Sequence, residues 1–130
     1  MGIVARVDRK GAMKFAAKLI AHLEEKGLSV FLEPKLAERT KKTDNALPLE
    51  KMKTDLIITV GGDGTMLRAC LLIPKPEPPI LAVNMGVRGF LAEVEPKKAI
   101  DAVDKCLRGE FRLEKCMKLS VKTDEATFPE

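Results

Sequence analysis

The sequence has little from which to build a metal centre or a disulfide framework. Among its 130 residues there are three cysteines, Cys70, Cys106 and Cys116, which form no CxxC pair, and a single histidine, His22. This excludes the usual zinc patterns, and an odd number of widely spaced thiols suits a reducing compartment. We therefore expect the cysteines to be packing residues or inert thiols. We expect His22 at the surface or satisfied within the core, because no second metal ligand lies near it in the sequence.

Stacking aromatics and long apolar runs are also missing. Trp and Tyr are absent and the five Phe are scattered, which argues against a nucleic-acid-binding surface. The longest apolar runs, such as residues 70–73, are far too short to span a bilayer. Charged residues begin by Arg6, before any long apolar stretch, which argues against a signal peptide. These absences predict a cytoplasmic protein that binds neither nucleic acid nor membrane.

The composition and the length of the chain are typical of a globular domain. Hydrophobic residues make up 45% and charged residues 32% of the chain, and its length suffices for one domain with a single core. The net charge of +4 is mild and the lysines are dispersed. Such a surface tolerates anionic small molecules as ligands.

Apolar runs typical of strands alternate with helical spacing along the chain. Strands are expected at residues 2–7, 28–32, 56–60, 80–84, 111–113 and 117–122. Helices are expected at residues 12–23, 66–73 and 96–107, with Gly27 and Gly109 as stops and a surface loop with a short helix at 33–53. This order predicts an α/β fold, a Rossmann-like, mostly parallel sheet flanked by helices. In such sheets, ligands bind beyond the carboxyl ends of the strands.

A glycine-rich turn follows the expected strand at 56–60. Residues 61–65 read Gly-Gly-Asp-Gly-Thr, and helical character resumes directly after them. Glycines permit close backbone approach, and the unpaired N–H groups at the start of a helix favour phosphate. Each charge-assisted hydrogen bond to such an anion contributes about 1.5–3 kcal/mol. We expect Thr65 to cap this helix and Arg68 to lie near the same end of it.

Asp63 is the unusual residue of the turn, because a carboxylate inside a phosphate cradle is repelled by the ligand. It suits phosphoryl transfer, in which it would orient Mg²⁺ or accept a proton from an attacking hydroxyl. The alternative is an Asx turn, in which Asp63 bonds its own loop backbone. The segment is not a P-loop, since no lysine follows the last glycine. Nor is it a GxGxxG fingerprint, since Leu67 takes the third glycine's place.

Two segments resemble a known enzyme family. VGGDGTMLRA at residues 60–69 resembles the signature of the NAD kinase family, which shares it with diacylglycerol and sphingosine kinases and phosphofructokinase. NMGVRGFLAEVE at residues 84–95 is similar to the NxGxxGFL motif typical of NAD kinases, and GIVAR with LRGEF…KLSV resembles archaeal-type members. The resemblance implies an enzyme that phosphorylates the adenosine ribose 2′-hydroxyl of NAD to give NADP. The implied phosphoryl donor is ATP or polyphosphate, with Mg²⁺ or another divalent cation.

The resemblance also implies a role for each matched position. Asp63 corresponds to the catalytic aspartate that activates the 2′-hydroxyl. The positions implied to bind nucleotide are Gly62, Gly64, Thr65, Arg68, Asn84, Gly86 and Phe90. By residue type, Arg68 also fits a solvated helix charge and Phe90 a core anchor. No side chain is expected to be a metal ligand.

The family's second, mostly β domain, which carries further NAD-binding residues, has no counterpart in this sequence. We expect residues 1–116 to form the α/β nucleotide-binding domain and residues 117–130 to begin the missing C-terminal domain. The chain is then a fragment that is inactive alone, from a protein expected to be a homo-oligomer when full length. The alternatives are a lipid or sugar kinase that shares GGDGT, or a nucleotide-binding paralogue without catalysis.

Overall fold

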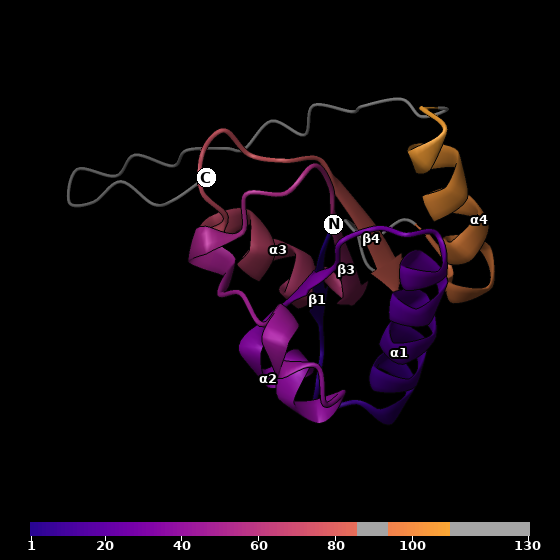
Figure 1. Cartoon of the computed structure of the whole chain (residues 1–130), viewed down its shortest axis with the longest axis horizontal. Helices are drawn as coiled ribbons and strands as arrows, with labels where there is room; N and C mark the ends of the chain where they lie inside the picture. Colours follow the sequence, from indigo (N-terminus) through magenta and orange to yellow (C-terminus); the bar gives the residue numbers. More distant parts are fainter. Residues whose placement is uncertain (86–93, 110–130) are drawn as a thin grey trace.

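A four-stranded parallel sheet with helices on both faces forms the protein (Figure 1). The structure is a computed structural model that describes residues 1–85 and 94–109. The strands are β1 (Gly2–Ala5), β2 (Phe31–Leu32), β3 (Ile57–Gly61) and β4 (Ile80–Asn84), in the spatial order β2-β1-β3-β4. All three ladders between them are parallel. The predicted Rossmann-like α/β fold is confirmed.

The helices form two layers around the sheet. Helices α1 (Lys10–Glu25) and α4 (Pro96–Leu107) lie side by side on one flank in Figure 1, and α3 (Asp63–Leu72) lies on the other. Along β1, Ile3 and Ala5 pack in the cluster under α1 and α4, whereas Val4 packs in the cluster under α3. This alternation follows from the pleat of a strand, and it explains why β1 is apolar at every position.

A polar tie joins the two helices of the first layer. The His22 Nε2 of α1 lies 2.7 Å from an Asp104 carboxylate oxygen of α4, and the Lys26 ammonium lies 3.3 Å from the same oxygen. Both His22 and Asp104 are about three-quarters buried. His22 is therefore partly buried and has a hydrogen-bond partner, as expected for a satisfied histidine.

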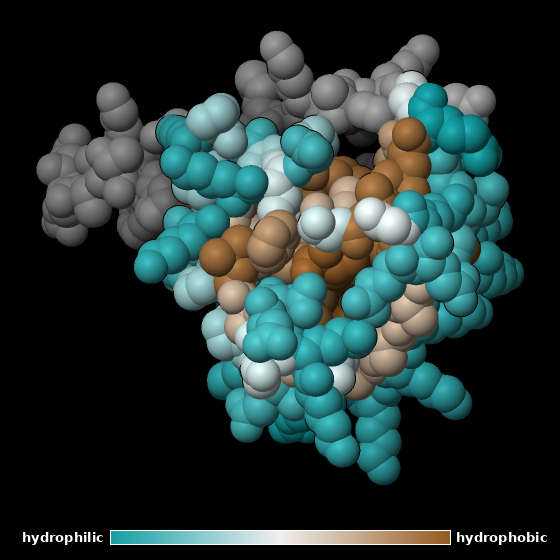
Figure 2. Space-filling model, in the orientation of Figure 1, coloured by the Kyte–Doolittle hydropathy of each residue, from teal (hydrophilic) through white to brown (hydrophobic). Residues whose placement is uncertain are grey.

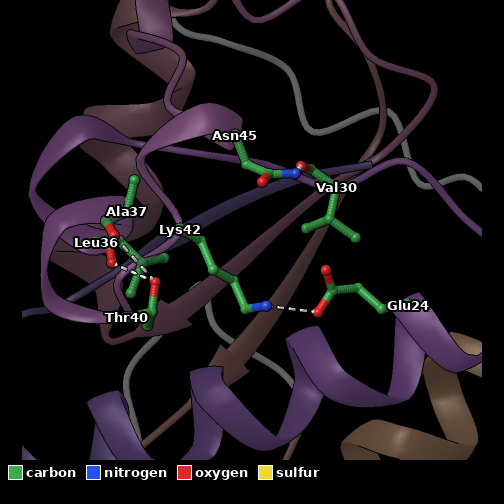
Figure 3. A network of polar contacts seen from close by, with 7 residues as sticks. All are labelled: Glu24, Val30, Leu36, Ala37, Thr40, Lys42 and Asn45. Atoms are coloured by element: carbon green, nitrogen blue, oxygen red, sulfur yellow. Dashed lines mark hydrogen bonds and ion pairs between the residues drawn. The ribbon is translucent and has the colours of Figure 1, made fainter.

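The segment between β2 and β3 is more ordered than the predicted surface loop. It contains α2 (Pro34–Arg39) and two short 3-10 turns, Thr43–Asn45 and Leu49–Lys51. Figure 3 shows how it is anchored. The Asn45 amide donates to the Val30 carbonyl at 2.8 Å, and the Lys42 ammonium reaches Glu24 of α1 at 2.9 Å. These polar contacts reach residues 15 and 18 positions away in the sequence, and apolar periodicity does not reveal them.

Element boundaries differ most from the predictions at two places. Helix α3 starts at Asp63, three residues before the predicted start. The prediction missed this first turn because it carries glycines and a carboxylate instead of apolar residues at helical spacing. Strand β2 keeps only two of its five predicted residues. Gly27 and Gly109 follow their helices at φ +76°, as expected for helix stops. The expected strands at 111–113 and 117–122, and the boundary at residue 116, lie outside the described residues.

The amino-terminal end of the sheet carries an apolar cleft. It measures about 610 Å³ and is lined by residues just before or at the start of the strands and at the end of α4, including Met1, Leu28, Leu56, Pro79 and Leu107. Figure 2 shows hydrophobic surface in the middle of the view, near the N-terminus that Figure 1 marks. Across the two described ranges, none of the helices combines the length and apolarity needed to span a bilayer.

Candidate functional site

The glycine-rich turn lies at the carboxyl end of β3, where the sheet meets α3. Gly61 is the last residue of the strand, Gly62 is the N-cap and Asp63 is the first helical residue. The first helical hydrogen bond runs from the Met66 N–H to the Gly62 carbonyl at 3.2 Å. Asp63 is partly exposed. The positive end of the helix dipole therefore coincides with this turn and favours negative charge beside it.

Gly61 and Thr65 pack against each other inside the turn. A Cβ placed on Gly61 would overlap the Thr65 hydroxyl oxygen and would lie 3.0 Å from the Thr65 Cβ. Thr65 is only 8% exposed and lies within the helix, so the prediction that it caps the helix is wrong. The cap position is held by Gly62, which has no side chain to make a capping hydrogen bond. Gly61 was absent from the predicted site, although it belongs to the motif.

Gly62 and Gly64 differ from Gly61, because a Cβ at either position would meet nothing within 4 Å. Packing against the fold does not require glycine there. Open space beside the backbone is what close approach of a ligand needs. This is consistent with the predicted phosphate-binding role of both residues.

The structure brings Asn84 to the same place as the glycine-rich turn. Gly61 and Asn84 are register partners at the carboxyl ends of β3 and β4, and the Met85 N–H donates to the Gly61 carbonyl at 2.7 Å. The two sequence motifs therefore meet at one edge of the sheet, although Gly61 and Asn84 are 23 residues apart in the sequence. Gly86 and Phe90, also predicted for the site, lie outside the described residues.

Arg68 is held by a carboxylate from the end of β2. Its two terminal guanidinium nitrogens lie 2.6 Å from the two carboxylate oxygens of Glu33, a paired fork-to-fork geometry. Hydrogen bonding to Glu33 raises the pKa of Arg68, so the guanidinium stays charged. The Glu33 side chain is 15% exposed and that of Arg68 is 44% exposed. Arg68 is therefore paired with Glu33 and still partly exposed to solvent. Its contact with a ligand stays a prediction.

A basic cleft of about 390 Å³ opens between the start of α1 and the ends of β3 and β4. Its lining residues are Arg6, Arg9, Lys10, Gly11, Ala12, Gly61, Gly62, Asn84 and Met85. Three of these are cations and none is acidic. The Arg6 Nε lies 2.9 Å from an oxygen of Asp8, which is not part of the lining. The cleft lies at the carboxyl ends of the neighbouring strands β1 and β3. From this pair the chain continues to β2 on one side and to β4 on the other, and ligands of open α/β sheets usually bind at such a point.

The convergence of Arg6, Arg9 and Lys10 was not predicted, because the basic residues are dispersed along the sequence. A signal was present, since all three closely follow the apolar run of β1 and therefore had to emerge at its carboxyl end. The sequence does not show which strand lies next to β1. The pairing of β1 with β3 is what sets these cations beside Gly61 and Gly62.

A second cleft, of about 570 Å³, opens on the other side of β1. Its charged lining is mixed, with Glu33, Glu50 and Asp8 as well as Arg6, Lys35 and Arg68. The described ranges contain no group of three or more His, Cys, Asp or Glu side chains placed to hold a metal ion. Of these two clefts, only the one at the start of α1 is lined by the glycine-rich turn, and its charged lining is purely basic.

An open parallel sheet with a glycine-rich helix start at its carboxyl edge is the structure of an α/β nucleotide-binding domain. Residues 1–111 match the family described as the ATP-NAD kinase N-terminal domain. The chain belongs to this family.

Individual relatives agree with the family. The chain is 39% identical to the NAD kinase of Methanothermobacter thermautotrophicus over 122 residues, which cover 93% of the chain and 43% of the relative. It is 38% identical to the NAD kinase of Pyrococcus abyssi over 132 residues, covering 99% of the chain and 47% of the relative. The resemblance to archaeal-type members is confirmed, and the chain spans less than half the length of these relatives.

The fold has a counterpart among solved structures. The crystal structure of yeast NADH kinase complexed with NADH superposes with a TM-score of 0.73, at 22% sequence identity, over 84% of this chain and 38% of that one. At this identity the likeness concerns the fold, and it agrees with the parallel α/β architecture described above.

Proposed function

We propose that the chain is the nucleotide-binding half of an NAD kinase, and that Asp63 acts on the adenosine ribose 2′-hydroxyl of NAD. The observation that carries this proposal is the position of Asp63 in the first turn of α3, beside the open Gly62 and Gly64. A phosphate held by this helix start would lie next to a carboxylate. A pure phosphate binder gains nothing from that neighbour, whereas a phosphotransferase needs a group to receive a proton.

The reaction makes one bond and breaks one. The ribose 2′-oxygen attacks the terminal phosphorus of the donor, the new O–P bond forms, and the bond from that phosphorus to the leaving ADP or shortened polyphosphate breaks. Asp63 takes the proton of the hydroxyl, which frees the oxygen lone pair for attack. The N–H groups at the start of α3 stabilise charge on the transferred group. Gly62, Gly64, Thr65, Arg68 and Asn84 are proposed to position the two nucleotides around this point.

The residues present suit a divalent cation carried in by the donor. Mg²⁺ typically keeps several waters and binds one or two carboxylates together with substrate phosphates, without a dedicated protein cage. The one carboxylate of the glycine-rich turn, Asp63, receives the proton of the hydroxyl, and no group of three or more possible metal ligands occurs among the described residues, so the donor phosphates and water would hold the cation. When bound, such a cation neutralises charge on the donor phosphates.

The remaining features of the whole protein are part of the same proposal. We expect residues 117–130 to begin a second, mostly β domain that helps to hold NAD, and the full protein to be a cytoplasmic homo-oligomer without nucleic-acid or membrane partners. The length of the curated relatives supports a second domain. The family match favours NAD over the lipid or sugar substrates of other GGDGT kinases.

A chimera tests the proposed function. The chain replaces the matching N-terminal part of the Methanothermobacter thermautotrophicus NAD kinase, and NADP formation is measured with NAD, Mg²⁺ and either ATP or polyphosphate. We expect turnover by the chimera and none by the 130-residue chain alone, because proximity of the held hydroxyl contributes up to about 7–11 kcal/mol. A folded chimera that makes no NADP contradicts the proposal. Turnover by the chain alone contradicts the need for a second domain.

A further inference from the structure

We propose that the second cleft, beside α2, binds a ribonucleoside through the 2′- and 3′-hydroxyls of its ribose, with the Glu33 carboxylate as their acceptor. This inference rests on the proposed function and assigns a part of its substrates that does not take part in the reaction. The shared chemistry of the ligand is an unreacted ribose diol. Such a diol occurs in the nucleoside of ATP and in the nicotinamide riboside of NAD.

The second cleft lies at the carboxyl ends of β1 and β2. Its lining includes Ala5 and Val7 at or just after the end of β1 and Glu33 directly after β2. Residues 48–50 and Arg68 of α3 complete it. The carboxyl edge of a parallel sheet is where open α/β folds bind ligands. The volume of about 570 Å³ lies within the range of small-molecule pockets, about 300–1,000 Å³.

The Glu33 carboxylate is held in place and keeps acceptor positions for a ligand. Glu33 is the N-cap residue of α2, yet its side chain makes no capping hydrogen bond. Instead, each carboxylate oxygen lies 2.6 Å from a guanidinium nitrogen of Arg68, and the Glu33 side chain is 15% exposed. An ionised carboxylate has about four acceptor positions on its two oxygens, and the fork with Arg68 occupies one on each. A second donor can therefore reach each oxygen from the cleft.

Two hydroxyls on adjacent carbons are donors that suit such a carboxylate. The 2′- and 3′-hydroxyls of a ribose are vicinal, so they can donate to its two oxygens together. In dinucleotide-binding α/β folds, an acidic residue about 20 residues after the first strand-to-helix turn accepts a hydrogen bond from a ribose hydroxyl. Glu33 follows Lys10, the first residue of α1, by 23 positions. The cleft thus has a carboxylate where this class of fold places its ribose acceptor.

The rest of the lining favours a neutral ligand with an apolar face. The charged lining consists of three acidic and three basic side chains, namely Asp8, Glu33, Glu50, Arg6, Lys35 and Arg68. This balance gives no net attraction for a polyanion. Pro48 and the core residues Leu36 and Leu49 also line the cleft and provide apolar surface for the face of a base. Arg6 lines both clefts, so one ligand can extend from the nucleoside site toward the glycine-rich turn.

The test measures binding of adenosine and of 2′,3′-dideoxyadenosine to the 130-residue chain by proton–nitrogen NMR titration. The two probes differ only in the two hydroxyls, and neither carries a phosphate. Glu33→Gln keeps the size of the side chain and removes its charge. Glu38→Gln, at an exposed position of α2 outside the lining, is the matched control. Arg68→Gln removes the partner of Glu33 and keeps the carboxylate, and the NMR spectrum of each variant verifies its fold.

We expect adenosine to shift the amide signals of Lys35, Leu36 and Glu50 in the wild-type chain. Dideoxyadenosine should bind about tenfold or more weakly, since two hydrogen bonds to a charged group are lost. Glu33→Gln should lower the affinity for adenosine about tenfold and remove most of this preference. Arg68→Gln should keep the preference. Glu38→Gln should change the affinity by less than about twofold, since an exposed charge outside the cleft is screened.

Three results of the titration would overturn the inference. They are equal binding of the two probes by the wild-type chain, no binding of adenosine, and a preference for adenosine that persists in Glu33→Gln. Loss of the preference in Arg68→Gln as well as in Glu33→Gln would mean that the ion pair shapes the cleft, and it would contradict Glu33 as the acceptor of the diol.

The outcome is separable from that of the proposed function, because this titration requires no turnover. If the chimera is inactive while adenosine binds as expected, the kinase assignment fails and the nucleoside site stands. In an active chimera, the KM values of Glu33→Gln identify the source of the nucleoside. A rise in KM for ATP alone assigns the cleft to the donor, and a rise in KM for NAD alone assigns it to the nicotinamide riboside. Unchanged KM values for both substrates would contradict the inference.

Discussion

Gly61 leaves no room for a side chain because the buried Thr65, in the first turn of α3, packs directly against it. The contact fixes where the strand ends and the helix begins, and therefore where Asp63 stands. Gly61 is not at a positive φ, so the need for glycine there is steric.

We accordingly expect Gly61→Ala to destabilise the chain by about 1–3 kcal/mol, as overpacking of a buried contact does. Gly64→Ala is the matched control, because its Cβ meets no atom and alanine favours a helix over glycine by up to about 1 kcal/mol. Urea denaturation of both variants measures the difference. Gly61→Ala/Thr65→Ala should recover part of the loss, since the overlapping hydroxyl is gone. A tolerated Gly61→Ala would show that this contact does not set the turn.

Asp63→Asn in the chimera should lower kcat by about 10²–10⁴-fold and leave most of the affinity for NAD. The substitution preserves the size of the side chain and removes only its charge and its basicity. Asp101→Asn, an exposed position on α4, serves as the control for the same chemical change. A coupled NADP assay checks the result. If Asp63→Asn keeps more than about a tenth of the kcat, the proton-accepting role is wrong.

Arg68→Ala in the chimera should raise KM for NAD or for the donor, by a factor that shrinks as salt is added. Arg68 lies in α3 and is held by Glu33 at the second cleft, with a side chain that is still 44% exposed. Arg39→Ala on α2 removes the same charge from an exposed position outside the clefts. Kinetic constants of Arg68→Ala that match those of wild type at every salt concentration would leave the Glu33 pair as a purely structural contact.

The tie between α1 and α4 should make stability depend on acid pH. Hydrogen bonding from His22, then from Lys26, lowers the pKa of Asp104 below its ordinary 3.8. A carboxyl whose pKa is lowered by folding contributes stability that is fully present above 3.8 and lost as the pH falls through the lowered value. Asp104→Asn should thus be less stable than wild type at neutral pH, and the gap should close in strong acid.

Urea denaturation of wild type and Asp104→Asn over a pH series measures this gap. Asp101→Asn, in the same helix and ion-paired with the exposed Lys105, is the control and should show a much smaller difference. A gap for Asp104→Asn that persists unchanged below the lowered pKa would mean that packing, and not the charged hydrogen bond, links the two helices.

Local pattern along the chain determined much of this protein by itself. The apolar runs at 56–60 and 80–84 predicted β3 and β4, because a strand covered on both faces has no polar alternation. The residues after β3 predicted a glycine-rich turn that leads into a helix, and α3 indeed begins at Asp63, whereas phosphate binding by this turn stays a prediction. These features depend on neighbours in the chain, which the sequence displays directly.

Only the tertiary structure decided which side chains meet at the site. The order β2-β1-β3-β4 puts Arg6, Arg9 and Lys10 beside Gly61 and Gly62, although about 50 residues or more separate the two groups. Strand order arises from packing of whole faces, and periodicity along one segment carries no information about which strand will become its neighbour. The start of α3 was misjudged for a related reason. Its first turn is helical because Thr65 packs on Gly61 at the sheet edge, a contact that apolar spacing does not encode.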